Sequence, residues 1–545
     1  MALDTTALAN TWRKLVEFTL DTTTIRYSDT DIALSDNTLY AGRVVNISEL
    51  RRSVGRLLDP KLQQPQMRVG LDNEDDSVRI TLDTYEFANR PVTIKLGQGT
   101  TAGDYDEIFT GVVKFPAGVE WDDGSVSIRI TDLVESQSRV LPTGKFFPSA
   151  YPNVEAKSKY LPIPIVYGDW RTTAGNGETV PCYCDDTTAG IGGHFTIASH
   201  VLDSIEDVYL GGVSTSYTAD LANGGFTLNV VYDPLVDIIT ANCTGAEDSG
   251  GTLIQSLPDI LSDILTTHLS VTAGQINSTA FSNWEGNLSV ADYGRRVISS
   301  EVSSNTLVSE LLVDGFADLT IEGGKYKPVY RIVDVIAGIP TYRAEDILDK
   351  SDSTKNFRVV RDEERVYANQ IVADYSYDPV ESNFSDRYDT EDTGAINTVN
   401  QRRRRRLQLQ WLYTDTGAQN RAQRELFVFS TEVETVFLTL QGSAVTLAPT
   451  DQFRLIYSKY PTDGTTIGTP FQIREILVDP LKMTARVKAW NMLNLSSGRW
   501  TADSATTWLL STTTERNDQG YWTDGSGYAD PSGAPDESSK RSKWF

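Results

Sequence analysis

The residues of this 545-residue sequence that could bind a transition metal are three cysteines and three histidines. Cys182 and Cys184 are separated by one residue, whereas structural zinc sites usually space paired cysteines by two to four residues and use four ligands. Cys243 and His194 would have to complete such a set. We therefore expect Cys182 and Cys184 to be strand residues packed on one face, and we expect no metal and no cofactor.

Catalytic motifs are the next possibility. His194, His200 and His268 form no His-Glu-x-x-His pattern, and the sequence has neither a Gly-x-Ser-x-Gly elbow nor a Gly-x₄-Gly-Lys-Ser/Thr loop. A glycoside hydrolase needs only two carboxylates on a sugar-binding surface, so the 74 acidic residues leave that class open. No pair stands out, and we predict that the chain is not an enzyme.

A run of five arginines is the most conspicuous charged feature. The run consists of Arg402, Arg403, Arg404, Arg405 and Arg406. Apolar residues then alternate from Leu407 to Trp411, which predicts that the arginines are the solvated start of a strand whose odd-numbered face becomes buried. The acidic residues shortly upstream are the expected partners: Asp386, Asp389, Glu391 and Asp392. The alternative is an interface with an acidic neighbouring protein or with DNA.

The overall charge limits the partners. With 49 basic and 74 acidic residues the net charge is −25, which disfavours sequence-specific binding to nucleic acid and binding to anionic lipid. No apolar stretch approaches the roughly 18 residues of a membrane span, and residues 1–20 lack the pattern of a signal peptide. We therefore expect a protein without a membrane-spanning segment, made and kept in the cytoplasm of the cell that produces it.

The elements that position these residues are mostly strands in the first half of the chain. Alternating apolar and polar residues at 15–20, 77–82 and 125–130 predict half-buried strands in a β domain, a barrel or sandwich, over residues 1–145. Prolines at 162 and 164 predict an extended edge strand at the start of a second β domain, residues 146–250.

Helical spacing appears after residue 250. Apolar residues from Leu257 to Leu265 predict a helix near 256–268 with Ser256 as its N-cap, and a second helix is predicted near 304–314. A hairpin at 317–332 follows, so residues 251–400 are expected to form an α+β domain.

The last structured region combines one helix with strands. A helix at 417–427 precedes four alternating segments, which predicts a small β barrel or sheet within residues 401–495. The four segments are 435–440, 452–457, 471–476 and 483–490. The expected fold class is mainly β with a few helices (α+β), in a multidomain chain built from β-barrel or sandwich modules.

Residues 496–545 lack periodic apolar patterning but contain four of the ten tryptophans. Aromatic residues are depleted in disordered chains and dominate interface anchors. We predict an extended C-terminal arm that lies on a neighbouring subunit or partner, with Trp522, Trp544 and Phe545 as anchors. The alternative is packing back on its own domain.

The order of segments after residue 416 resembles the late domain of the central tail hub proteins of siphovirus-type bacteriophages and gene transfer agents. In those proteins a strand, a Pro-Gly-Asp-type turn and a strand that carries an arginine follow one another. Here Thr450 stands where glycine is common. The segments involved are the helix at 417–427, Val436-Phe437-Leu438-Thr439-Leu440, Leu447-Ala448-Pro449-Thr450-Asp451 and Phe471-Gln472-Ile473-Arg474-Glu475-Ile476. Residues 162–168 and 303–332 also resemble tail-tip proteins.

This resemblance implies a structural hub at the tip of a phage tail. It implies β modules arranged around a homotrimeric ring that surrounds the tail lumen. The implied partners are the distal tail protein, the tape-measure protein and the spike or fibre proteins of the tip. The expected location is the virion, after synthesis in the cytoplasm of the host bacterium. Two alternatives stay open: a carbohydrate-binding tail adhesin that recognises a receptor, and a tail-associated glycoside hydrolase.

Overall fold

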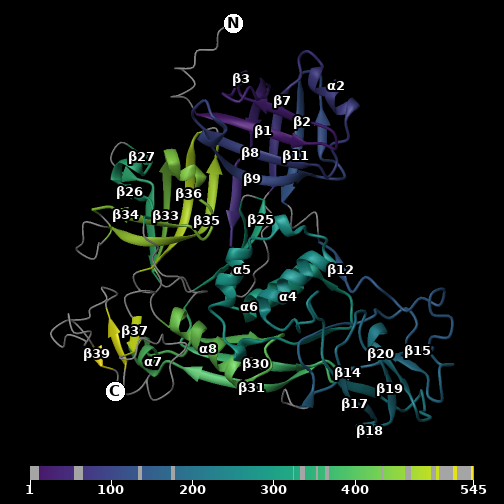
Figure 1. Cartoon of the computed structure of the whole chain (residues 1–545). Coiled ribbons are helices and arrows are strands. Elements are labelled where there is room, and N and C mark those ends of the chain that lie inside the picture. The colour runs from purple at the N-terminus through teal and green to yellow at the C-terminus, as the bar shows by residue number, and fades with distance from the viewer. Residues whose placement is uncertain are drawn as a thin grey trace.

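The computed structural model confirms a mainly β, multidomain chain with a few helices. It describes residues 12–54, 66–132, 138–172, 178–322, 324–331, 338–351, 354–361, 367–430, 434–458, 460, 468–480, 482–492, 499–502, 520–523 and 542–543. Two sheets lie side by side in an upper lobe, and a lower lobe combines helices, a three-stranded sheet and a β module at one end (Figure 1). We use "upper lobe" and "lower lobe" in this sense throughout.

A ten-stranded sheet forms the N-terminal part of the upper lobe, in the order β3-β4-β2-β1-β8-β9-β11-β7-β5 with β10 beside β11. Alternation places Val16 and Phe18 of one strand, and Val126 and Ile128 of another, in the core, as predicted. The strands are β1 (Arg13–Thr19), β2 (Thr24–Ser28), β3 (Ile32–Ala33), β4 (Leu39–Gly42), β5 (Val44–Ile47), β7 (Gln66–Asp72), β8 (Pro91–Gly97), β9 (Tyr105–Val113), β10 (Val119–Trp121) and β11 (Ser125–Asp132).

One predicted strand in this region is wrong. Residues 77–82 belong to the helix α2 (Ser77–Thr84), although their apolar residues alternate. The preceding acidic turn explains the difference, because the Asp75 carboxylate accepts hydrogen bonds from the backbone and hydroxyl of Ser77, and Asn73 accepts one from the backbone of Arg79. Arg79 also bonds Asp83 one turn later, at 3.0 Å.

The second sheet of the upper lobe has seven strands in the order β26-β34-β35-β36-β33-β29, with β6 beside β35. The four strands predicted after residue 434 are confirmed, and β6 comes from the N-terminal part of the chain. Both sheets share one apolar core, because Val16 and Val126 belong to the same buried cluster as Val436 and Ile473. The strands are β6 (Leu50–Ser53), β26 (Thr341–Arg343), β29 (Phe357–Arg361), β33 (Glu434–Gln441), β34 (Gln452–Ile456), β35 (Thr469–Asp479) and β36 (Thr484–Asn491).

The helices of the lower lobe enclose the second core, around Trp284 and Trp411. The two helices predicted after residue 250 are confirmed, and the Ser256 hydroxyl caps the first by accepting a hydrogen bond from the backbone of Asp259. The helices are α4 (Leu257–Asp263), which continues as the single π turn η4 (Ile264–His268), α5 (Ser278–Glu285), α6 (Ser304–Asp314), α7 (Thr393–Val399) and α8 (Asp415–Phe429). Further 3-10 turns lie in the two lobes: η1 (Ala102–Asp104), η5 (Ala273–Gln275), η6 (Val290–Asp292), η7 (Ala344–Asp346) and η8 (Gly442–Thr446).

A three-stranded sheet covers α8, in the order β31-β30-β32 (Figure 1). Its strands are β30 (Gln370–Asp378), β31 (Asn383–Glu391) and β32 (Arg404–Gln408). Four short two-stranded pairings complete the described lobes: β12 (Val140–Leu141) with β23 (Val302–Ser303), β13 (Ile165–Tyr167) with β22 (Arg296–Ile298), β24 (Ala317–Glu322) with β25 (Lys325–Tyr330), and β27 (Asp349–Ser351) with β28 (Thr354–Lys355).

A separate β module lies between β13 and β22 in the chain, at one end of the lower lobe (Figure 1). It consists of two four-stranded sheets around a third core that includes Phe195 and Phe226. We call it the inserted module. The first sheet contains β14 (Val180–Pro181), β21 (Ile239–Cys243), β17 (Ile205–Leu210) and β18 (Val213–Thr215); the second contains β15 (Tyr183–Asp186), β16 (His194–Thr196), β20 (Gly225–Leu228) and β19 (Tyr217–Asp220), which leads into η3 (Leu221–Asn223).

Candidate functional site

The last three arginines of the run, Arg404 to Arg406, begin β32 (Arg404–Gln408), which pairs in parallel with β30, and Arg402 and Arg403 precede this strand. The predicted alternation is present: Arg404 and Arg406 are exposed, whereas Leu407 and Leu409 are buried. The prediction of a fully solvated start is wrong for Arg405, because its position is odd-numbered and its side chain is only 5% exposed. Arg405 therefore points into the lower lobe and does not contribute to an outer surface.

Arg405 is buried together with a carboxylate partner. Its Nη1 donates to Glu425 Oε1 over 2.6 Å, and Arg421 Nη1 donates to the other oxygen of the same carboxylate over 2.8 Å. Glu425 and Arg421 lie one turn apart on α8. The two guanidinium groups hold the pKa of Glu425 below its ordinary value against the effect of burial.

Two of the exposed arginines of the run, Arg402 and Arg406, have carboxylate partners. Arg406 and Arg387 both bond Asp374 of β30, and Arg402 Nε donates to Glu391 over 3.2 Å. Of the four predicted acidic partners, Glu391 is confirmed, whereas Asp389 accepts from Gln370 and Asp392 caps α7. The prediction missed Asp374 and Glu425. For Glu425 the sequence did contain a signal, because Arg421 and Glu425 are four residues apart on a predicted helix, a spacing that favours an ion pair.

The aromatic anchors predicted at the C-terminus are described only in part. Backbone strands β37 (Arg499–Ala502), β38 (Gly520–Thr523) and β39 (Ser542–Lys543) form a small sheet, in which Trp522 is opposite Trp500. Trp544 and Phe545 lie outside the described residues. The role of these residues as interface anchors therefore stays a prediction.

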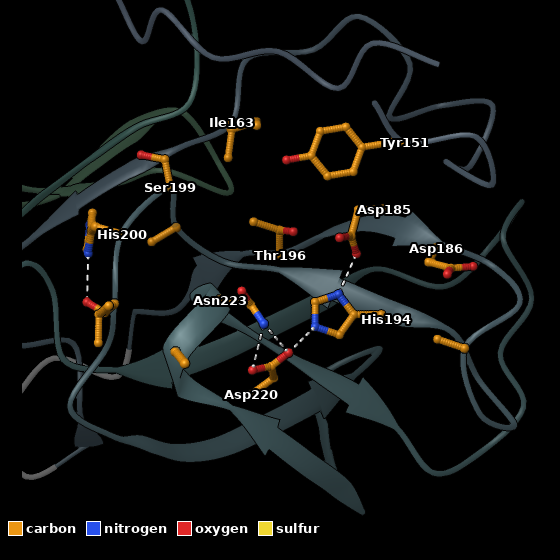
Figure 2. Close-up of a pocket in the computed structure, with 14 residues that line it drawn as sticks. Tyr151, Ile163, Asp185, Asp186, His194, Thr196, Ser199, His200, Asp220 and Asn223 are labelled. Carbon is orange, nitrogen blue, oxygen red and sulfur yellow. Dashed lines mark hydrogen bonds and ion pairs between the residues drawn. The ribbon is translucent and has the colours of Figure 1, made fainter. Parts of the chain in front are cut away.

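The inserted module contains a pocket of about 570 Å³, which the sequence did not reveal (Figure 2). Its polar wall is built by the second sheet of the module and by η3, and the coil residues Tyr151 and Ile163 line the other side. The residues that line it are Tyr151, Ile163, Asp185, Asp186, Ala189, His194, Thr196, Ala198, Ser199, His200, Val201, Asp220, Ala222 and Asn223.

His194 lies between two carboxylates at the centre of the polar wall (Figure 2). Its Nδ1 is 2.6 Å from Asp185 Oδ1, and its Nε2 is 3.5 Å from Asp220 Oδ2. A bulge in β15 between Cys184 and Asp186 changes the register beside His194. Gly225 on the neighbouring strand leaves room for the ring, since a Cβ there would come within 2.9 Å of His194 Cε1.

The two histidines of the pocket have pKa values that are shifted in opposite directions. The hydrogen bond to Asp185 raises the pKa of His194 in spite of partial burial, with smaller contributions from Asp220 and Asp186. Burial lowers the pKa of His200, whose Nε2 accepts a hydrogen bond from the backbone of Val166 and whose Nδ1 lies 3.0 Å from the Val201 carbonyl oxygen. Three aspartates, Asp185, Asp186 and Asp220, line the pocket and make it acidic.

The cysteines lie behind this wall. Cys184 and Cys243 are buried in the core of the inserted module, and Cys182 is partly buried beside it. Burial raises the pKa of the Cys184 thiol to about 11, so this thiol is a packing residue and not a nucleophile. Among the described residues no group of three or more His, Cys, Asp or Glu side chains has the arrangement of a metal site.

The chain as described is a mainly β, multidomain protein whose surface offers an arginine-rich strand and an acidic pocket. No family model matches its sequence, and no curated protein matches it either. Three solved structures illustrate what it is similar to. The 43 kDa tail protein of prophage MuSo2 from Shewanella oneidensis has 11% identity and a TM-score of 0.39, with 88% of this chain and 98% of that chain covered.

The other two structures also come from tails or related particles. A chain of the native gene transfer agent virion has 11% identity and a TM-score of 0.36, with 60% of this chain and 84% of that chain covered. The prophage tail protein gp18 of Listeria monocytogenes EGD-e has 8% identity and a TM-score of 0.32, with 88% and 94% covered. None of the helices in the described ranges has the length and apolar composition needed to cross a membrane.

Proposed function

We propose that this chain is a structural protein of a phage tail, and more specifically the hub at the tail tip. In this role it joins the tail tube and distal tail protein to tip or fibre components and surrounds the lumen as a homotrimer. It performs no chemistry and needs no cofactor. Its place is in the virion, after synthesis in the host cytoplasm.

The proposal rests on the way in which the segments that resemble tail hub proteins come together in the structure. Strand β33 and the arginine-bearing strand β35 belong to one sheet, and the turn at 447–451 leads into β34 of the same sheet. Strand β6, from the N-terminal part of the chain, pairs with β35 and extends this sheet. Arg474 of β35 then donates to Asp318 of the lower lobe over 2.8 Å. Contacts of this kind between distant parts of the chain favour a rigid protein that can connect other tail components.

The buried contact between the lobes supports rigidity. Asp318 accepts from Arg474 on one oxygen and from Arg331 Nη2, at 3.0 Å, on the other, and all three side chains are buried. Two guanidinium groups keep the pKa of Asp318 below its ordinary value against the effect of burial. Because both oxygens of this buried carboxylate have guanidinium partners, moving the lobes apart would leave buried charges without partners. The contact therefore favours one relative orientation of the two lobes.

Localisation in assembled particles tests the tail assignment. Antibody raised against this chain and imaged by electron microscopy should bind particles at the tail end far from the capsid. Binding to the capsid, or absence of the chain from purified particles, would contradict the proposal. Cleavage of peptidoglycan or polysaccharide by the purified chain would instead favour the glycoside hydrolase alternative.

The exposed arginines of the run are the proposed interface within this function. Changing Arg402, Arg403 and Arg404 to Gln should leave the unfolding midpoint nearly unchanged, since exposed ion pairs contribute little, but should impair tail assembly. Arg406 is kept in this variant because it pairs with the buried carboxylate of Asp374. A control variant with three partly exposed arginines of the N-terminal sheet changed to Gln has the same change in charge: Arg26, Arg68 and Arg129. Equal assembly of both variants would remove the interface role.

The C-terminal anchors are proposed as a second interface. Deleting residues 499–545 removes Trp522, Trp544 and Phe545 together and should give a folded chain that assembles poorly. Loss of folding in the isolated chain would show instead that this segment completes a core of its own subunit.

A further inference from the structure

The pocket of the inserted module plays no part in the proposed structural function. Its volume of about 570 Å³ falls in the range of small-molecule sites, and its polar groups converge from three strands and one 3-10 turn. Figure 2 shows Tyr151 and Ile163 on one side and His194 with its two carboxylates on the other. From this arrangement we infer that the pocket is a binding site for an uncharged saccharide.

Hydrogen-bonding groups are concentrated at the centre of the polar wall. Asp185 binds His194 Nδ1 and fixes the ring, so that the other nitrogen faces Asp220 across 3.5 Å. His194 Nε2 has no hydrogen-bond partner among the described residues, although its side chain is only 14% exposed. Asp220, whose side chain is 38% exposed, is the member of this pair that a ligand hydroxyl can reach and donate to, and His194 holds it in place from behind.

Further polar groups surround that point. Asn223 lies beside Asp220, with its Nδ2 2.9 Å from Asp220 Oδ2, and Thr196 and Ser199 add hydroxyl groups. Carboxylate, amide, imidazole and hydroxyl groups together supply the donors and acceptors that neighbouring sugar hydroxyls require. A polar wall opposite an apolar and aromatic one matches a sugar ring, which has hydroxyls at its edge and C–H groups on its faces.

Charge narrows the ligand class. Asp185, Asp186 and Asp220 line the pocket, and His194 is the one side chain there whose pKa is raised towards a cationic form. A phosphate or an acidic sugar would face this excess of negative charge, so both are disfavoured. A saccharide without acidic groups fits both the charge and the hydrogen-bonding pattern.

Divalent cations are the competing ligand, and the geometry disfavours them. Asp185 is engaged by His194, and Asp186 accepts from the backbone and hydroxyl of Thr188 at 2.8 and 2.6 Å. Calcium requires six to eight oxygen ligands, and the carboxylates of this pocket are bound to neighbouring side chains instead of facing one point.

The test uses the full chain and named probes. Glucose, galactose, rhamnose, N-acetylglucosamine and disaccharides of each are titrated while saturation-transfer NMR and calorimetry follow binding, with N-acetylneuraminic acid and Ca²⁺ as competing probes. We expect at least one neutral sugar to bind with a Kd near or below the millimolar range. No binding of any neutral sugar at roughly 10 mM, or binding of Ca²⁺ or the acidic sugar alone, overturns the inference.

Variants place the ligand in the pocket. Asp220→Asn and His194→Gln should each weaken sugar binding at least tenfold, whereas Asp203→Asn, an exposed change in the same module outside the pocket, should leave it unchanged. If Asp220→Asn fails to fold, Ala222→Trp narrows the pocket at an exposed position without altering its charge and should also abolish binding. Undiminished binding by the folded variants contradicts the inference. None of these outcomes changes the mass of the assembled ring, so the proposed function is tested separately.

Discussion

At the scale of single residues, the lower lobe depends on buried charges that share partners. Glu425 lies between Arg405 and Arg421, and the three side chains are between 0% and 5% exposed. Removing the carboxylate leaves two guanidinium groups buried without it, which is far more costly than losing an exposed ion pair.

Glu425→Gln should therefore lower the free energy of unfolding by about 3–5 kcal/mol. The matched control is Arg402→Gln, which removes an exposed pair with Glu391 and should cost less than about 1 kcal/mol. Urea unfolding followed by tryptophan fluorescence measures both. Similar losses for the two variants would show that burial does not set the energy of these pairs.

Asp314 provides the second prediction at this scale. It is buried at the end of α6 and accepts hydrogen bonds from the backbone of Trp411 and Leu412, and burial raises the pKa of Asp314 to about 7. In the unfolded chain this carboxyl ionises near its ordinary pKa, so between about pH 4 and pH 7 the folded state holds one proton more. Stability from this group is therefore present at low pH and is lost as pH rises through 7.

Asp314→Asn should remove that dependence. Between pH 5 and pH 8 the wild type should lose about 3 kcal/mol relative to the variant, because each pKa unit corresponds to about 1.4 kcal/mol. The measurement is the difference in unfolding free energy between the two proteins at each pH. A constant difference across this range would contradict a carboxyl that ionises near neutrality.

Sequence patterns predicted the packing of residues better than their ion pairs. Alternation from Leu407 onward correctly gave the buried face of β32, but it could not show that Arg405 shares this face, because arginine is seldom buried without a partner. The partners Asp374 and Glu425 come from other elements. The pocket was missed for the same reason, since Asp185, His194 and Asp220 lie on three strands and meet only after folding.

At the scale of elements, the strands and helices with regular spacing were predictable, and local turns decided the exceptions. Residues 77–82 alternate like a strand, yet Asp75 and Asn73 of the preceding turn accept hydrogen bonds from the first-turn backbone and favour the helix α2. The expected domain ranges stay predictions. The structure adds that α8 contributes to the core of the lower lobe, whereas the strands β33 to β36 contribute mainly to the core of the upper lobe, with Trp490 as an exception that packs in the lower core.

The turn before β34 gives a prediction for an element. Thr450 has a φ of 77°, in the left-handed region that suits glycine, and the Asp451 carboxylate holds the turn by accepting from the backbone of Ala448 over 2.7 Å. A β-branched residue is strained there. This is the position at which glycine is common in the proteins that the sequence resembles.

Thr450→Gly should stabilise the chain by about 1 kcal/mol, because relief of strain exceeds the entropy that glycine adds to the unfolded state. Thr450→Ala keeps a Cβ and serves as the control, with little or no gain expected. Thermal unfolding compares the three proteins. A glycine variant less stable than the wild type would show that the turn is not strained.

At the scale of the whole molecule, buried ion pairs and strand pairing hold distant parts of the chain together. The Arg474–Asp318–Arg331 contact links the second upper sheet to the lower lobe, and β6 ties the N-terminal part to the same sheet. The inserted module lies at the far end of the lower lobe (Figure 1), where a ligand site stays clear of these contacts. The molecule thus combines a rigid frame with one peripheral binding module.

The solution mass of the purified chain, alone and mixed with the neighbouring tail proteins, tests the central claim most directly. A hub should form a closed ring, and the account predicts a species of three times the 60.2 kDa of one chain that gains mass when the distal tail protein is added. Mass photometry at several concentrations measures both properties. A chain that stays at 60.2 kDa at every concentration and binds neither the distal tail protein nor tip components would contradict the account.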